Sequence, residues 1–526
     1  MSMSSSSLVR LGAALARVVR PVHQPIRSGR RPTRNNEVLL VASPGPSANM
    51  QAVRLFVVAV VVGLVAVLGG SAGVAKEALP SGETSGGVTT VTEGASAERP
   101  NIVLFLTDDQ PPYTLRTMPE VRGRIVARGT IFDQTFSSYP LCCPGRATIQ
   151  RGQYAFNHGV VGNSAPYGGW SRFDELDLEQ STIATWLDDA GYKTGYFGKY
   201  INEYETAHVP PGWDRWHVQV GEYDGSRVNE DGRVHDYSSD IHKDAYYSRK
   251  AVEWLDQAVQ QEESVFAQIG FSAPHSPANY QQEYADEFSV AEVPRTPDFN
   301  ERDLSDKPYS RDRLTSEEVV QADAFHRRQL RSLQTVDETV RKAITTVRSR
   351  GELENTYFIF YTDNGYHNGH HRFKKGKLEP YRTDTRFPLL VRGPGVPEGS
   401  TTDALASNND IAPTIASIVG AEIPDFVDGR SLVPLLDSNP ANDVPWRTAL
   451  LSQRGNGTWW ALAEDDLTYI EREGGGRELY HLEEDPYEVE NAYGSASEEE
   501  KARLHERLET IKGCAGEGCR TAEDGP

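Results

Sequence analysis

The apolar residues of the chain form short continuous runs, and segments with helical spacing lie between them. The runs that suit strands buried on both faces are Asn101–Leu106, Lys193–Phe197, Val265–Phe271, Thr356–Tyr361 and Pro388–Val391. Helical spacing covers 181–190, with Ser181 as the expected N-cap, and also 244–261 and about 316–350. This alternation predicts an α/β fold in which a large, mostly parallel sheet is sandwiched by helices.

The pattern changes after residue 430, where the apolar segments become shorter. Four of them, 446–452, 458–463, 467–471 and 478–482, are typical of antiparallel strands. Ser497 is a suitable N-cap for a charged helix running to about Lys512. We therefore predict a main domain over 100–430 and a smaller C-terminal α+β subdomain over 431–526, with an antiparallel sheet. The polar stretch 203–240 has no steady period and predicts loops that could shape substrate choice.

Three segments precede the first predicted strand. Residues 1–49 contain seven Arg and one Glu among many Ser and Ala, which indicates a disordered extension or an over-long start. Residues 50–75 resemble a signal peptide, with Arg54, an apolar run over 55–68 and small residues before Lys76. Residues 76–99 are typical of a linker. Export is the first prediction, and an uncleaved anchor at the cell surface is the alternative.

Charge and cysteine content agree with export. The chain has a formal net charge of −21, and without residues 1–75 it has 46 basic and 74 acidic residues, a net charge of −28. Nucleic acid is therefore excluded as an expected partner, because such binding needs a basic surface. Cys514 and Cys519 flank a short Gly-containing segment that could close a disulfide, with a metal site as the weaker alternative.

Polar residues that could bind a cation or an anion follow four of the predicted strands. They are Asp108–Asp109, Lys199, His275 and Asp363–Asn364. Each alone is compatible with a solvated turn or a surface side chain. Ligands of parallel sheets gather beyond the carboxyl ends of the strands, so the shared position indicates one site. Carboxylate and amide oxygens favour Ca²⁺ or Mg²⁺ over Zn²⁺.

The most informative stretch is Leu141 to Thr148, which reads LCCPGRAT. Pro144 is preset for a first helical turn, so Cys142 should lie just before a helix N-terminus. Such an end attracts anions, and the Arg146 guanidinium could clamp an oxyanion. A buried cysteine pair beside a turn is the plainer alternative, because free cysteine often packs as a small hydrophobe.

The spacing Cys142-x-Pro144-x-Arg146 followed by Gly152 resembles the signature of sulfatases, members of the alkaline phosphatase superfamily. The wider run from Pro140 to Val160 is most similar to the N-acetylglucosamine-6-sulfatase branch. Lys377, with Tyr381 four residues on, matches the second active-site lysine of that family. Gly145 stands where Ser or Ala is usual, and Gln150–Arg151 where Leu–Thr is usual.

The resemblance implies a secreted sulfate ester hydrolase in which Cys142 is converted to formylglycine by a formylglycine-generating enzyme. The hydrated aldehyde, a gem-diol, would attack sulfur. The implied metal ligands for Ca²⁺, or Mg²⁺, are Asp108, Asp109, Cys142, Asp363 and Asn364. Arg146, Lys199 and Lys377 would hold the sulfate oxygens, and His275, or Lys377 in its place, would protonate the leaving group.

The expected substrate is a small-molecule or glycan sulfate ester, either a sulfated sugar or an aryl sulfate. Two alternatives remain open. A phosphodiesterase or phosphonate hydrolase could use the same scaffold. A sulfated-glycan binding homologue could keep the fold with Cys142 unconverted, and Gly145 and Arg151 are the residues that favour this second alternative.

Overall fold

The computed structural model describes residues 99–525 except 222, 224, 262, 438–444 and 456. The predicted extension, the signal peptide and the linker up to residue 98 lie outside the described residues. Within the described ranges, no helix is both long enough and apolar enough to cross a membrane.

A ten-stranded sheet, in the order β11-β2-β10-β9-β1-β8-β4-β5-β6-β7, forms the centre of the fold. Its parallel core is β9 (Thr356–Thr362), β1 (Asn101–Asp108), β8 (Val265–Pro274), β4 (Lys193–Gly198) and β5 (Arg215–Gln219). All eight residues of β1 are buried, as expected for a strand covered on both faces. The prediction of a mostly parallel sheet is therefore confirmed.

Antiparallel strands extend this core at both edges. On one side are β10 (Leu389–Arg392), β2 (Thr130–Phe132) and β11 (Ser400–Thr402), with β11 running parallel to β2. On the other side is the hairpin β6 (Arg227–Glu230) and β7 (Arg233–Asp236). The prediction that 203–240 is all loop is thus wrong, because β5 and this hairpin lie within it. Polar side chains on edge strands hide the apolar alternation there. A separate pair joins β3 (Thr135–Phe136) to β12 (Ala406–Ser407).

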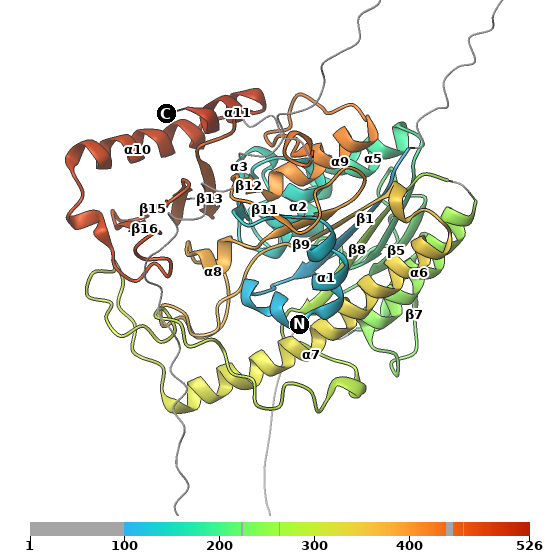
Figure 1. The fold of residues 1–526 in the computed structure, drawn as a ribbon, viewed down its shortest axis with the longest axis horizontal. Coiled ribbons are helices and arrows are strands. Elements are labelled where there is room, and N and C mark those ends of the chain that lie inside the picture. Colours follow the sequence, from blue (N-terminus) through green and yellow to red (C-terminus); the bar gives the residue numbers. More distant parts are fainter. Residues whose placement is uncertain are drawn as a thin grey trace, which may run out of the picture. The chain divides into compact units, whose positions relative to one another are not determined.

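Helices cover both faces of the large sheet (Figure 1). One face carries α6 (Lys243–Gln260) and α7 (Ser316–Ser349), with α1 (Pro119–Arg124) beside α7. The other carries α2 (Cys142–Arg151), α5 (Ile183–Asp189) and α9 (Ile411–Val419). Short helices occur at α3 (Ala155–His158), α4 (Gly169–Glu175) and α8 (Arg382–Thr385). Leu330, Leu333, Val336, Val340 and Ile344 of α7 are all buried, as their spacing predicts.

Helix starts follow from their capping residues. The Thr315 side chain accepts a hydrogen bond from the Glu318 backbone and so begins α7. For α5 the N-cap is Thr182, in a capping box with Thr185, and the predicted cap Ser181 is one residue too early. Ser181 instead accepts a hydrogen bond from the Trp186 indole through its hydroxyl.

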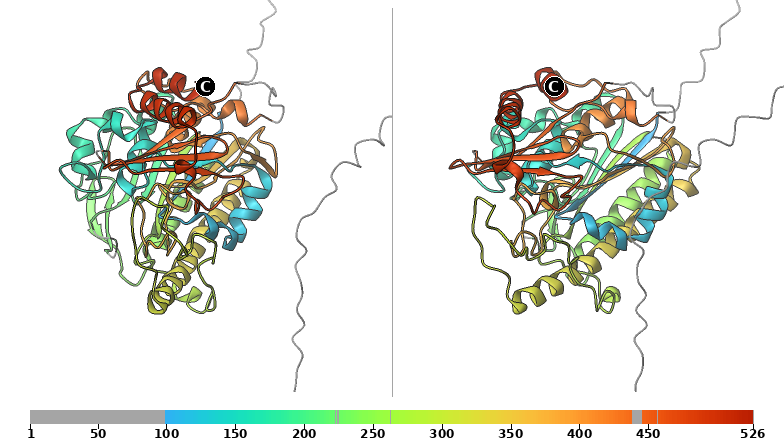
Figure 2. Two further views of the ribbon diagram at one scale, coloured as in Figure 1. Left: turned by 90° about the vertical axis from the view of Figure 1, so that its left-hand side faces the viewer. Right: turned by 60° about the vertical axis from the view of Figure 1, so that its left-hand side comes forward.

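The C-terminal part contains a four-stranded antiparallel sheet, seen edge-on in Figure 2. Its strands are β13 (Leu450–Arg454), β14 (Trp459–Ala463), β15 (Leu467–Arg472) and β16 (Arg477–His481). Helix α10 (Glu498–Lys512) begins at Ser497 as predicted and packs on β13 and β14. Cys514 and Cys519 form the expected disulfide. A further helix, α11 (Glu517–Asp524), was not predicted, because its short sequence EGCRTAED contains a glycine and few apolar residues.

Candidate active site

The carboxyl ends of the neighbouring parallel strands β1 and β9 bring the predicted acidic residues together. Thr107 pairs with Thr362 in register, so Asp108–Asp109 and Asp363–Asn364 leave the sheet side by side. Asp109 adopts a left-handed backbone conformation (φ 62°) that turns the chain sharply after the strand. Its N–H donates to Asp363 Oδ1 at 3.1 Å. All four side chains are buried.

Helix α2 places the candidate nucleophile over this acidic pair. Leu141 is the extended N-cap and Cys142 is the first helical residue, so the helix begins one residue earlier than predicted. Cys142 Sγ lies 3.2 Å from Asp108 Oδ1 and 3.8 Å from Asp109 Oδ1. Gly145 permits this close packing, because a Cβ at that position would lie 2.7 Å from the Asp363 carbonyl oxygen.

Three cations surround the carboxylates. Arg146, one turn after Cys142, donates through Nε to Asp363 Oδ2 at 2.8 Å and through Nη1 to the Lys199 carbonyl at 2.7 Å. Lys199 follows β4 and donates to Asp108 Oδ2 at 2.5 Å. Lys377 donates to Asp109 and lies 2.6 Å from Cys142 Sγ. The centre thus has three carboxylates and three permanent cations.

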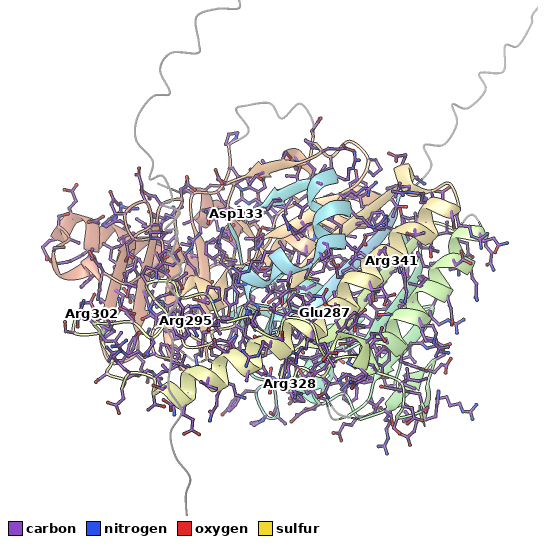
Figure 3. All side chains as sticks on the ribbon, turned by 60° about the horizontal axis from the view of Figure 1, so that its bottom comes forward. Asp133, Glu287, Arg295, Arg302, Arg328 and Arg341 are labelled. Atoms are coloured by element: carbon purple, nitrogen blue, oxygen red, sulfur yellow. A yellow bond between two sulfur atoms is a disulfide. The ribbon has the colours of Figure 1, made fainter. Side chains whose placement is uncertain are left out.

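His275 follows β8 on the outer side of the centre. Its Nδ1 lies 2.6 Å from the Ser276 carbonyl, and since a carbonyl only accepts, Nδ1 carries a proton. Nε2 therefore faces the centre, 3.6 Å from Asp109 Oδ2. The segment after His275 is fixed to α7, because Arg328 donates to the Pro277 carbonyl at 2.7 Å and Arg331 donates to that of Glu287 at 2.8 Å. Figure 3 labels Arg328 and Glu287 on this face.

Tyr223 completes the outer side, although no sequence pattern indicated it. Its hydroxyl donates to Asp108 Oδ2 at 3.1 Å, and its ring stacks on the His275 imidazole with centroids 4.0 Å apart. Lys199 Nζ lies 4.8 Å from the same ring centroid. Tyr223 belongs to the polar stretch predicted as loop, where no strand end or motif marks a position.

The charges within the centre control one another. Burial alone would raise the pKa of Asp108, but Lys199, His275, Arg146 and Lys377 hold it well below its usual range. Burial and then Asp108 raise the pKa of Asp363 to about 6. Burial, followed by Asp108, also raises the pKa of the Cys142 thiol far above its usual value. A thiol in this position stays protonated and is a poor nucleophile at neutral pH.

The donor set fits a hard divalent cation. Asp108, Asp109 and Asp363 offer carboxylate oxygens, and Asn364 Oδ1 is buried yet accepts no hydrogen bond from any described residue. An acceptor oxygen with no donor in a buried site is costly unless a cation compensates it. Ligand atoms of Asp108, Asp109, Cys142 and His275 also lie within 4.8 Å of one another. A divalent cation would give the centre a net charge suited to a sulfate group.

The structure brings together every residue predicted for the site. The contacts above link Asp108, Asp109, Cys142, Arg146, Lys199, His275, Asp363 and Lys377. Asn364 joins them through its side-chain N–H, which donates to Asp109 Oδ1 at 2.8 Å. Their chemical roles stay predictions.

The sequence of this chain is similar to members of one protein family. The sulfatase family model matches residues 100–421. A protein of Caenorhabditis elegans named as an extracellular sulfatase homologue is 34% identical over 375 residues, covering 68% of this chain and 52% of that protein. The N-acetylglucosamine-6-sulfatase of Homo sapiens is 30% identical over 483 residues, covering 81% of this chain and 87% of the relative. The chain thus spans about half the length of the first relative.

Solved structures show the same fold. A protein in complex with its substrate D-glucosamine-2-N,6-O-disulfate has a TM-score of 0.66 at 22% identity, covering 79% of this chain and 98% of that one. A phosphonate monoester hydrolase from Silicibacter pomeroyi has a TM-score of 0.63 at 20% identity, covering 79% of this chain and 96% of that one. Because the family match covers more than half of the sequence and contains every residue of the centre, the chain belongs to the sulfatase family and has its alkaline phosphatase-like fold.

Proposed function

We propose that the protein is a secreted, metal-dependent sulfate ester hydrolase in which Cys142 is converted to formylglycine. The observation that carries the proposal is the position of Cys142 Sγ, within 3.8 Å of two carboxylates and 2.6 Å from the Lys377 ammonium. Conversion would supply a hydrated aldehyde whose hydroxyl can attack sulfur. The raised pKa of the unconverted thiol supports this proposal, because the thiol itself is poorly suited to attack.

Asp108, Asp109, Asp363 and Asn364 would hold Ca²⁺, with Mg²⁺ as the alternative. The cation would supply positive charge beside the sulfate oxygens. Lys377 contacts Cys142 Sγ, and Lys199 contacts Asp108, the carboxylate beside Sγ, so their ammonium groups can bind sulfate oxygens as negative charge develops. Arg146, also predicted to hold a sulfate oxygen, donates to Asp363 and to the Lys199 carbonyl, so the role proposed for it is to orient both of these groups.

His275 is the proposed proton donor to the leaving oxygen, with Lys377 as the competitor. Because Nδ1 already holds a proton, Nε2 would donate from the imidazolium form; burial lowers the pKa of His275, and Asp108 and Asp109 oppose that shift. Nε2 faces the centre, and the side chain is 21% exposed, so it can exchange protons with solvent. Stacking on Tyr223 and the Nδ1 contact with Ser276 fix the ring. The departing alcohol must pass the outer side of the centre, and this is where the proton donor is fixed.

The proposed substrate is a sulfated sugar or an aryl sulfate, reached outside the cytoplasm. Relatives named as an extracellular sulfatase homologue and as an N-acetylglucosamine-6-sulfatase support this proposal, as does the structural neighbour bound to a sulfated glucosamine. Maturation would require a formylglycine-generating enzyme as a partner. Export through residues 50–75 stays a prediction.

Paired assays test the reaction class. Protein produced together with a formylglycine-generating enzyme should hydrolyse 4-nitrophenyl sulfate and act far more slowly on the matched phosphate and phosphonate esters. The reverse preference would favour the phosphonate hydrolase alternative. The Silicibacter pomeroyi neighbour, a phosphonate monoester hydrolase, is the reason for including phosphonate esters in the assay. Absence of turnover on all of them, with retained binding of a sulfated sugar, would favour an unconverted binding homologue.

A further inference from the structure

A cavity of about 220 Å³ adjoins the catalytic centre on its outer side. Three segments enclose it: the residues before β6, those between β7 and α6, and the turn after β8. Its walls include Tyr223, Ser226, Tyr237, Ser239, Ser272 and His275. Resting on the proposed function, we infer that this cavity is the subsite for the organic part of the ester, and that it takes a single sugar ring.

The exposure of the centre indicates this side. Cys142 and Asp363 are fully buried, and Asp108 is as well. The side chains of His275 and Lys377 are 21% and 11% exposed. The alcohol bound to sulfur must therefore leave the centre past these groups. His275 belongs both to the centre and to the cavity wall. A group bound in the cavity would therefore lie next to the residue that protonates the leaving oxygen.

The wall combines neutral hydroxyl groups with one lysine, Lys243, whose ammonium group donates to the Tyr223 carbonyl. Ser226, Ser239, Ser272 and Tyr237 contribute neutral hydroxyl groups. The one carboxylate in the wall, Asp244, accepts hydrogen bonds from the Ser272 and Ala273 N–H groups, both at 2.9 Å. Its charge is therefore held by the backbone. Aromatic faces combined with neutral polar side chains are typical of pockets that orient a small polar ligand.

The rings that line the cavity are held in place. Tyr237 stacks on Tyr246 of α6 with centroids 4.1 Å apart, and Tyr223 stacks on His275 at 4.0 Å. Lys243 donates to the Tyr223 carbonyl at 2.5 Å and fixes this loop to the start of α6. The volume equals that of about seven water molecules, which is the scale of one ring.

A matched pair of variants tests the subsite. Ser239 and Ser238 are adjacent and both exposed, but only Ser239 lines the cavity. We expect Ser239→Trp to fill it and to lower kcat/KM for glucosamine 6-sulfate about tenfold or more, whereas Ser238→Trp stays near wild type. Competitive inhibition by inorganic sulfate should be equal in all three proteins, because sulfate binds at Cys142, and this equality also shows that the variants are folded. Inhibition by free glucosamine should be lost only in Ser239→Trp.

Equal kcat/KM for Ser239→Trp and Ser238→Trp, or glucosamine inhibition that survives in Ser239→Trp, would overturn the subsite while leaving the sulfatase proposal intact. A converted wild-type protein that hydrolyses no sulfate ester would instead refute the proposed function.

Discussion

Two clusters of buried charged residues in this protein have a similar composition but differ in which of their polar atoms lack a hydrogen-bond partner. The rim cluster is the catalytic centre: Asp108, Asp109, Asp363, Arg146, Lys199 and Lys377. The C-terminal cluster joins the start of α9, the segment before β13 and helix α11, and consists of Asp410, Arg430, Arg447 and Glu523. In the C-terminal cluster, Asp410 accepts from Arg447 at 2.7 Å and Glu523 accepts from the Tyr154 hydroxyl at 2.7 Å.

The difference lies in which atoms lack partners. Both oxygens of Asp410 and of Glu523 have a donor or a cation beside them, and the unpartnered polar atoms of this cluster, within the described ranges, are arginine N–H groups. Next to the rim cluster, the unpartnered atom of the adjoining Asn364 is an acceptor, Oδ1, beside oxygens that face Cys142. Buried ion pairs alone therefore do not mark an active site. Oxygens that converge on a reactive side chain do.

Metal removal should have the largest effect, and only on the rim cluster. Exhaustive chelation is expected to abolish sulfatase turnover, and added Ca²⁺ or Mg²⁺ should restore it, because four oxygen-bearing side chains lose their common cation. Turnover and the thermal unfolding temperature should be measured on the same chelated sample, so that loss of activity can be distinguished from loss of folding. Full activity in metal-free protein would contradict the assignment of the metal site.

His275→Ala should reduce turnover by roughly 10² to 10⁴-fold on alkyl sulfates, the range typical of general acid catalysis. Activated aryl sulfates should lose less, because their leaving oxygen needs no proton. The comparison is kcat on the two substrate classes. An equal loss on both would indicate that His275 acts by holding Tyr223 in place.

Arg447→Met should act in the opposite way, on stability. Removing this cation takes away the buried ion pair of Asp410 and leaves Glu523 with the more distant Arg430, and breaking a buried pair typically costs about 3–5 kcal/mol. Chemical denaturation should show this loss, while kcat of the remaining folded protein stays near wild type. A variant with normal stability and lost turnover would mean that the two clusters are coupled.

Acid should affect a group that belongs to neither cluster. Burial, and then Arg151, lower the pKa of His158 to about 3, whereas an unfolded histidine titrates near 6.5. The unfolded chain therefore binds the extra proton between these values, and stability is lost as pH falls below 6.5. The loss at pH 5 is about 2 kcal/mol for this one group. His158→Gln should flatten that part of the curve, and an unchanged pH dependence would assign the acid sensitivity elsewhere.

Much of the fold could be predicted because buried parallel strands are continuous apolar runs. Once these strands were predicted, the polar residues that follow β1, β4, β8 and β9 could be predicted to meet at one edge of the sheet. Edge strands and short helices escaped prediction, since half-exposed strands such as β7 have no apolar alternation. Tyr223 could not be predicted either, because its contacts with Asp108 and His275 come from tertiary packing of a loop.

The adjacent cysteines give the most direct test of the central claim. Cys143 is part of the main apolar core, and its N–H donates to Asn163, whereas the Cys142 side chain faces the carboxylates and Lys377. Only Cys142 also has Pro144 and Arg146 at the spacing of the sulfatase motif.

The decisive measurement is mass spectrometry of the peptide spanning residues 142 and 143, taken from active protein. We predict that residue 142 has lost its sulfur and reacts as an aldehyde, and that residue 143 keeps its thiol. Cys142→Ala should lose both the aldehyde and the activity, while Cys143→Ala should keep both with a modest loss of stability from a small cavity. Sulfur lost from residue 143, or turnover by protein that retains both thiols, would contradict the account.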